Sequence, residues 1–143
     1  MSGFTAGPCL LKDTMQLSSF YNKKFSLGHS AMSVNEGMPK FIYDDLKRNN
    51  NLKNKTIGLL GLTFKADCDD IRDSLAIKLL KYLQKKKIKV LYTDEFCTYK
   101  GLIKKEELIK RSDIIIISTP HSAYKKIKVN KKKILVDIWG LIN

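Results

Sequence analysis

The first segment whose residue types could do chemistry is Gly7-Pro8-Cys9, a cysteine placed directly after a turn-forming pair. A helix that begins here would direct its amide dipoles at the sulfur, and Lys12 would add a positive charge, so a thiolate would be stabilised. Asp13 follows Cys9 by one helical turn on the same face, where its carboxylate could orient a water molecule or a general base. A small buried cysteine without a chemical role remains the alternative.

The second such segment, Phe64–Ser74, is long and highly charged, with Lys65 and Arg72 among four aspartates. Cations that directly follow a strand and precede a helix could hold an anion through charge-assisted hydrogen bonds. The residue types agree equally well with a helix cap at Asp73 or Ser74 and a solvated Lys65. The sequence has neither the G-x-G-x-x-G spacing of a dinucleotide fingerprint nor a Walker A run.

A helical part followed by alternating strands and helices must position these residues. Apolar residues at helical spacing predict a helix over Leu10–Tyr21. A second helix is predicted over Ser30–Arg48, after a break at Gly28, and Pro39 is expected to kink or divide it. The strands are predicted at Thr56–Leu60, Lys89–Tyr92, Asp113–Ser118 and Ile134–Asp137, with helices at Ser74–Lys86, Lys104–Lys110 and, as a single turn, His121–Lys126.

This order predicts an α/β protein in which a helical N-terminal segment precedes a Rossmann-like domain with a parallel sheet. The boundary between the two parts is predicted between residues 52 and 53, so that they comprise residues 1–52 and 53–143. Parallel sheets bind ligands at the carboxyl ends of their strands. The segments expected there are 61–73, 118–122 and 137–140.

Composition excludes several classes of protein. The longest apolar run, Ile114–Ile117, is far too short to cross a membrane, no secretory leader opens the chain, and three widely spaced cysteines favour a reducing cytoplasm. The net charge is +13, but only three of the 27 basic residues are arginine. Lysine-rich solvated faces are therefore favoured over a nucleic-acid-binding module, which is kept as the alternative from another class.

Taken together, the motifs resemble the UDP-glucose/GDP-mannose dehydrogenase family in its C-terminal portion. The resemblance rests on the order and spacing of several short motifs along nearly the whole chain. They are Gly7-x-Cys9-x-x-Lys12-Asp13, Val34-Asn35-Glu36-x-Met38-Pro39, Gly61-Leu62-Thr63-Phe64-Lys65, Asp70-Ile71-Arg72-Asp73-Ser74, and the strand from Asp113 that leads into Thr119-Pro120-His121.

The resemblance implies an NAD-dependent enzyme that oxidises the C6 alcohol of a nucleotide sugar to a carboxylate with two NAD⁺ per turnover. Cys9 would attack the intermediate aldehyde as a thiolate to form a thiohemiacetal, which is oxidised to a thioester and then hydrolysed. Asp13 corresponds to the aspartate that helps to activate water, and Lys12 to a lysine present in some members. No metal is implied.

The resemblance also assigns binding roles and partners. Phe64 and Lys65 correspond to residues that contact the nucleotide sugar, and Arg72 to one that reaches toward the cofactor. Residues 53–143 would form the UDP-binding domain, and residues 1–52 the catalytic-cysteine loop with the remnant of the central dimerisation helix. The implied partners are a UDP-sugar and either a second copy or a complementary N-terminal half; neither nucleic acid nor membrane is expected.

Three departures from the family pattern matter. The turn before the cysteine reads Ala6-Gly7-Pro8 instead of containing two glycines, and Asp137-Ile138-Trp139-Gly140 replaces the usual Asp-x-Arg element. These changes make an N-acetylated hexosamine at least as probable a substrate as glucose. The N-terminal NAD-binding domain has no counterpart in this sequence, so the isolated chain is expected to be inactive, as a fragment, one half of a split enzyme, or a catalytically silent remnant that still binds UDP-sugars.

Overall fold

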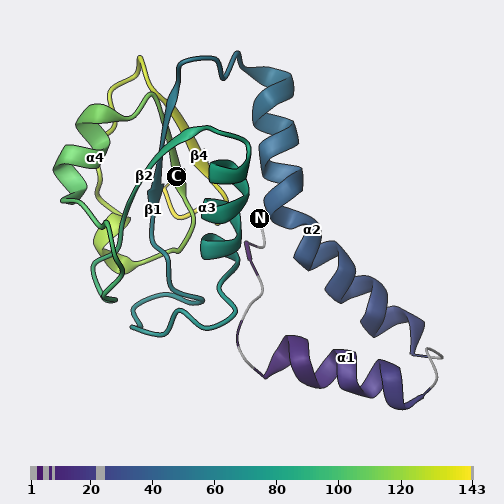
Figure 1. Cartoon of the computed structure of the whole chain (residues 1–143). Helices are drawn as coiled ribbons and strands as arrows, with labels where there is room; N and C mark the ends of the chain where they lie inside the picture. The colour runs from purple at the N-terminus through teal and green to yellow at the C-terminus, as the bar shows by residue number, and fades with distance from the viewer. Residues whose placement is uncertain (1–2, 5–6, 8, 22–24, 143) are drawn as a thin grey trace.

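The computed structural model describes residues 3–4, 7, 9–21 and 25–142 of the chain. Two helices come first, and a sheet with crossover helices follows them (Figure 1). The elements are α1 (Leu10–Phe20), α2 (Ser26–Asn49), β1 (Thr56–Leu60), α3 (Leu75–Lys85), β2 (Lys89–Thr93), α4 (Lys105–Arg111), β3 (Ile114–Ile117), the 3₁₀ turn η1 (Ser122–Tyr124) and β4 (Ile134–Asp137). Every strand and helix predicted from the sequence is present, with bounds that shift by a few residues at most.

All four strands are parallel, in the order β2-β1-β3-β4. At the carboxyl ends, Leu60 of β1 is paired with Thr93 on one side and Ile117 on the other, and Ile117 is paired with Asp137. This register aligns the ends of the strands, so the loops that follow them begin along one edge of the sheet. The predicted α/β fold with a Rossmann-like parallel sheet is confirmed.

Helices cover both faces of the sheet. On one face, Ile57 and Leu59 of β1 pack with Leu79 of α3 and Leu46 of α2 in the larger hydrophobic core. On the other face, Leu60 packs with residues of β3, α4 and η1 in a second core. Because β1 and β3 are covered on both sides, their residues are buried almost without interruption, as expected for strands inside a parallel sheet.

The second helix differs from its prediction at both of its special residues. The expected break at Gly28 was wrong: α2 begins at Ser26 and passes through this residue. A Cβ atom at Gly28 would lie 2.1 Å from the ring of Phe25, so this glycine allows an aromatic ring to approach the helix closely. Pro39 does not divide the helix, although α2 changes direction about midway along its length (Figure 1).

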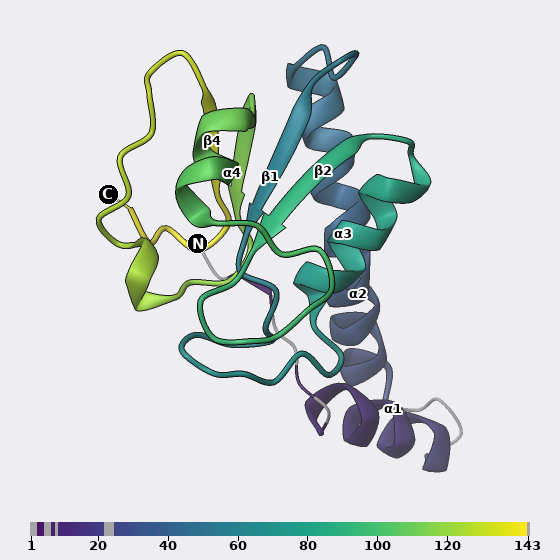
Figure 2. The ribbon, with the colours of Figure 1, turned by 60° about the vertical axis from the view of Figure 1, so that its left-hand side comes forward.

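The helical pair extends from the sheet domain toward the carboxyl ends of the strands. Figure 2 shows α1 at the same end of the sheet as the loops that follow β1 and β2. Large apolar side chains on this pair, including Phe20, Leu27 and Phe41, are exposed. Among the helices of the described residues, none has the length and apolar content needed to cross a membrane.

Gly61, the first residue after β1, is expected to tolerate no side chain. Its φ is +91°, and a Cβ atom would lie 2.4 Å from Cβ of Thr119. Replacement by alanine should lower the free energy of unfolding by at least about 2 kcal/mol through backbone strain and overpacking, measured by urea denaturation. Gly37 is the control, because nothing lies within 4 Å of its added Cβ. Gly37→Ala should stabilise α2 by about 0.5–1 kcal/mol, and equal effects at both positions would contradict this explanation.

Candidate functional site

The three segments predicted at the carboxyl edge meet there. The hydroxyl of Ser118 donates to the carbonyl oxygen of Gly61 at 2.7 Å. The hydroxyl of Thr119 donates to the carbonyl oxygen of Thr63 at 2.8 Å. The indole N–H of Trp139 donates to the carbonyl oxygen of Ser118 at 3.1 Å. The loops after β1, β3 and β4 are therefore joined into one surface by buried and half-buried hydrogen bonds.

Three described residues that precede Cys9 contact this edge or the core next to it. Phe4 is buried in the larger core, and a Cβ atom on Gly3 would lie 2.2 Å from the indole of Trp139. Further along, a Cβ atom on Gly7 would lie 3.2 Å from the ring of Phe64. Gly7 has a φ of +135°, which favours glycine at this close approach. The cysteine segment is thus packed against the loop that contains the predicted substrate-binding residues.

Cys9 is exposed and is the N-cap residue of α1, as the sequence predicted. The backbone N–H of Asp13 donates to the carbonyl oxygen of Cys9 at 2.8 Å, which closes the first helical turn. The side chains of Lys12 and Asp13 are both exposed on this turn. Ala6 and Pro8, the residues that flank Gly7 in the predicted turn, lie outside the described residues. The structure therefore places Cys9, Lys12 and Asp13 together at the start of one helix.

Phe64 and Lys65 lie at the tip of the loop between β1 and α3. The N–H of Phe64 donates to the carbonyl oxygen of Asp70 at 3.0 Å, and this bond folds the loop back on itself. The ring of Phe64 is partly buried, whereas Lys65 is exposed, with its Nζ 5.5 Å from the centre of that ring. An aromatic surface beside a free ammonium group is a suitable combination for a base or sugar ring that has a phosphate attached.

Arg72 lies in the second half of the same loop. Its guanidinium forms a forked pair with the carboxylate of Asp70, with an Nη2–Oδ2 distance of 2.7 Å. Hydrogen bonds from Arg72 lower the pKa of Asp70 to about 2, and the same pair raises the pKa of Arg72, to which Cys9 adds a smaller electrostatic contribution. The charge of Arg72 is thus compensated mainly by Asp70 within the same loop.

Two residues that the sequence analysis did not single out as site residues support this loop from below. The carboxylate of Asp94, directly after β2, accepts hydrogen bonds from the N–H groups of Leu62 at 2.6 Å and Phe96 at 2.8 Å. Burial opposes the ionisation of Asp94, but hydrogen bonds from His121 and from backbone N–H groups outweigh it and lower the pKa to about 2. His121 is fully buried, with Nε2 3.1 Å from Asp94.

A signal for Asp94 was present in the sequence. It is the first residue after the second strand, where the rule for carboxyl ends applies, but the sequence analysis considered only the other three loops. His121 was quoted in the resemblance without a role. Its place beneath the loop depends on contacts across 54 to 58 residues of chain, which no local pattern reveals.

The edge is poorly suited to hold the pyrophosphate of a dinucleotide in the usual manner. In that arrangement free backbone N–H groups after the first strand face the phosphates at a helix N-terminus. Here the N–H groups of Leu62 and Thr63 point at the carboxylate of Asp94, and Ser74 caps α3. Arg72, the residue predicted to contact NAD, is exposed, so it is suited to a contact with the outer part of the cofactor.

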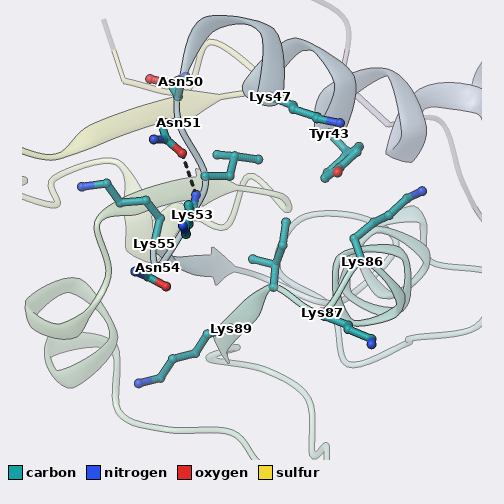
Figure 3. Close-up of a pocket in the computed structure, with 12 residues that line it drawn as sticks. Tyr43, Lys47, Asn50, Asn51, Lys53, Asn54, Lys55, Lys86, Lys87 and Lys89 are labelled. Atoms are coloured by element: carbon teal, nitrogen blue, oxygen red, sulfur yellow. Dashed lines mark hydrogen bonds between the residues drawn. The ribbon is translucent and has the colours of Figure 1, made fainter.

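A separate hollow of about 780 Å³ lies at the opposite, amino edge of the sheet (Figure 3). It lies between the C-terminal ends of α2 and α3 and the starts of β1 and β2. Six lysines line it: Lys47, Lys53, Lys55, Lys86, Lys87 and Lys89. Positive charge at helix C-termini complements the helix dipoles, which gives a structural reason for part of this cluster. None of the predicted site residues lines the hollow.

The fold and its carboxyl-edge loops define a Rossmann-like α/β domain with an attached helical pair and an exposed cysteine. Residues 58–143 match the UDP binding domain of the UDP-glucose/GDP-mannose dehydrogenase family. The chain belongs to this family of dehydrogenases.

Similar proteins agree with this assignment. The chain is 30% identical to UDP-N-acetyl-D-mannosamine dehydrogenase of Pyrococcus horikoshii over 95% of its own length and 35% of that protein's length. It is 30% identical to protein CapL of Staphylococcus aureus, over 99% and 38% of the two lengths. The solved structure of the Pyrococcus horikoshii UDP-D-ManNAc dehydrogenase superposes with a TM-score of 0.85 at 27% identity, over 99% of this chain and 36% of that one. The chain thus spans little more than a third of these relatives.

Proposed function

We propose that this chain supplies the nucleotide-sugar site and the catalytic cysteine of an NAD-dependent nucleotide-sugar 6-dehydrogenase. The observation that carries the proposal is the packing of Gly7, two residues before Cys9, against Phe64 in the loop that bears Lys65. In this proposal residues 53–143 bind the UDP moiety, and residues 1–52 provide the cysteine and the central helical segment. The sugar would then extend from the loop of β1 toward α1.

Binding would begin with the nucleotide. Phe64 offers an apolar ring for stacking, and the ammonium group of Lys65 donates to a phosphate oxygen. Lys65 is exposed and forms no ion pair with another described residue, so it can turn toward a ligand without breaking one. This placement would leave the C6 end of the sugar toward Cys9 and Asp13.

Chemistry would then take place at Cys9. The C6 alcohol would first be oxidised to the aldehyde, with transfer of a hydride to a first NAD⁺. The thiolate then adds to the aldehyde carbon, and the oxygen takes up a proton to give a thiohemiacetal. Loss of the hydroxyl proton, with transfer of the hydride from that carbon to a second NAD⁺, would leave a thioester. Asp13 orients a water molecule that attacks the thioester carbon, and the cleaved C–S bond releases the carboxylate and restores the thiolate. Lys12 contributes positive charge beside the oxygen that becomes negative during these additions. A reducing cytoplasm would keep Cys9 available as a free thiol.

NAD⁺ would supply the hydride acceptor. Since the edge loops lack a dinucleotide cradle, this chain would contact the cofactor mainly through Arg72, with most of the binding in a partner domain or complementary half. Trp139, which covers Gly3 where many members have an arginine, favours a substrate other than UDP-glucose itself. The N-acetylated sugars named for several relatives make a UDP-N-acetylhexosamine the proposed substrate.

Calorimetric titration of the chain with UDP, UDP-glucose and UDP-N-acetylmannosamine tests the binding part of the proposal. All three should bind with affinities in the micromolar to low-millimolar range, because the nucleotide provides most of the contacts. Adenosine diphosphate at the same concentrations is the control for charge alone. No heat with millimolar UDP, or equal affinity for both diphosphates, would contradict a UDP site. Binding without turnover after mixing with a dinucleotide-binding half would favour a catalytically silent remnant.

A further inference from the structure

His121 lies beneath the loop that contains Phe64 and Lys65, and all of its ring is buried. We propose that His121 is a positioning residue whose imidazole fixes this loop in the conformation that binds the nucleotide sugar. The inference rests on the proposed function, since it gives the loop a ligand. It adds a residue that touches no ligand and acts only through the loop and through Asp94.

The hydrogen bonds of the ring define its tautomer. Nδ1 accepts a hydrogen bond from the backbone N–H of Asp67 at 2.9 Å, so this nitrogen carries no proton. Nε2 must then carry the proton, which it donates to the carboxylate of Asp94 at 3.1 Å. Asp94 accepts further hydrogen bonds from four backbone N–H groups, so its ionised form suits this arrangement.

The two ring nitrogens hold the loop on both sides of Phe64 and Lys65, one through Asp94 and the other directly. On one side, Asp94 holds the N–H groups of Leu62 and Thr63, directly before Phe64. On the other side, Nδ1 holds the N–H of Asp67, two residues after Lys65. Phe64 and Lys65 thus lie between two fixed points of the loop. Both points are held by His121, one through Asp94 and the other directly at Asp67.

The far anchor also holds an unfavourable backbone conformation. Asp67 has a φ of +50°, which a residue with a side chain rarely adopts without local support. Its carboxylate accepts hydrogen bonds from the backbone N–H of Ser122 at 2.9 Å and from the Ser122 hydroxyl at 3.1 Å. His121 and Ser122 together therefore hold Asp67 to the loop after β3. A change in the backbone conformation of Asp67 would break these hydrogen bonds.

Packing keeps the imidazole from turning. Its ring centre lies 4.7 Å from that of Phe96 and 5.3 Å from that of Tyr124, on segments that follow β2 and β3. A phenylalanine in place of His121 would keep much of this packing and lose the hydrogen bonds to Asp67 and Asp94, together with the 3.3 Å contact between Nε2 and the Thr63 hydroxyl. A glutamine would keep a donor for Asp94 and lose the ring. The two variants thus separate packing from hydrogen bonding.

The test compares His121→Phe and His121→Gln with the unmodified chain by UDP titration and by hydrogen exchange of residues 62–70. Measurements are made well below each variant's Tm. His121→Phe should weaken UDP binding by about tenfold and speed exchange at the amide of Asp67, because the ligand must then order a loosened loop. His121→Gln should weaken binding less, because the anchor through Asp94 persists. A folded His121→Phe chain with unchanged UDP affinity would overturn the proposal.

A second measurement needs no variant. The chain contains two histidines, so ¹⁵N shifts of the imidazoles identify the tautomer of His121 directly. Because Nδ1 accepts from the N–H of Asp67, a proton on Nε2 is expected, and a proton on Nδ1 would overturn the proposal even if the variants failed to fold. Failure of the unmodified chain to bind UDP would overturn the proposed function together with the positioning of a ligand. Normal binding by the unmodified chain and by His121→Phe would overturn the role of His121 alone.

Discussion

Replacing Lys65 by alanine is expected to weaken binding of UDP by about ten- to a hundredfold, the range for loss of a hydrogen bond to a charged group. The ammonium group is exposed at the tip of the β1 loop, and its loss should leave the core unchanged. Calorimetric titration of both proteins with UDP measures the effect, and their Tm values should agree within a few degrees.

Lys132→Ala is the matched control because it removes the same charge at the other edge of the sheet. Lys132 is exposed in the turn that precedes β4, far along the strand direction from the carboxyl-edge loops. UDP affinity should change by less than about twofold in this variant at physiological salt, where distant charges are screened. If both lysine variants lost affinity equally, the effect would come from overall charge, and Lys65 would have no specific contact with the nucleotide.

Replacing Cys9 by serine is expected to reduce uronate formation by at least about a thousandfold, since a serine hydroxyl without an activating base is a far weaker nucleophile than a thiolate. The assay combines the chain with a dinucleotide-binding half and follows NADH together with the sugar product. UDP affinity should not change, because Cys9 precedes α1 as its N-cap residue and is not part of the nucleotide-binding loop.

Cys68→Ser provides the control within the same protein. Cys68 lies in the β1 loop, where its thiol donates to the carbonyl oxygen of Lys65 at 3.4 Å, and a hydroxyl can replace that contact. This variant should keep most of the turnover. Equal loss in both cysteine variants, or full turnover by Cys9→Ser, would contradict a nucleophilic role for Cys9. Absence of turnover with the unmodified chain would instead favour the silent remnant.

The fold was largely predictable because its signals are local. The apolar runs of β1 and β3, and the amphipathic spacing of α3, indicated their elements to within one residue at either end. The predicted start of α2 at Ser30 was wrong because a single glycine can either end a helix or allow a close contact within it. Gly28 allows close contact with the ring of Phe25, and only the folded structure distinguishes this role from an interruption of the helix.

The candidate site was predictable where its residues are joined by short motifs. Cys9 and Lys65 were recognised from their neighbours, whereas the contact between Gly7 and Phe64, which joins their two segments, depends on the folded arrangement. Asp94 and His121 were missed as site residues for the same reason. Asp94 follows the end of its strand, which is a local signal, but its hydrogen bonds and those of His121 arise only where the loops after β1, β2 and β3 meet.

We propose that the carboxyl edge of the sheet, and not the lysine-lined hollow at the amino edge, binds the nucleotide sugar. Each surface offers lysine side chains to a phosphate, Lys65 at the carboxyl edge and six lysines at the amino edge, so affinity alone does not distinguish them. Amide chemical shifts during titration with UDP-N-acetylmannosamine do. Changes should concentrate in residues 61–73, in residues 118–122 and around Cys9. Changes confined to residues 47–55 and 86–89 would contradict the assignment of the site.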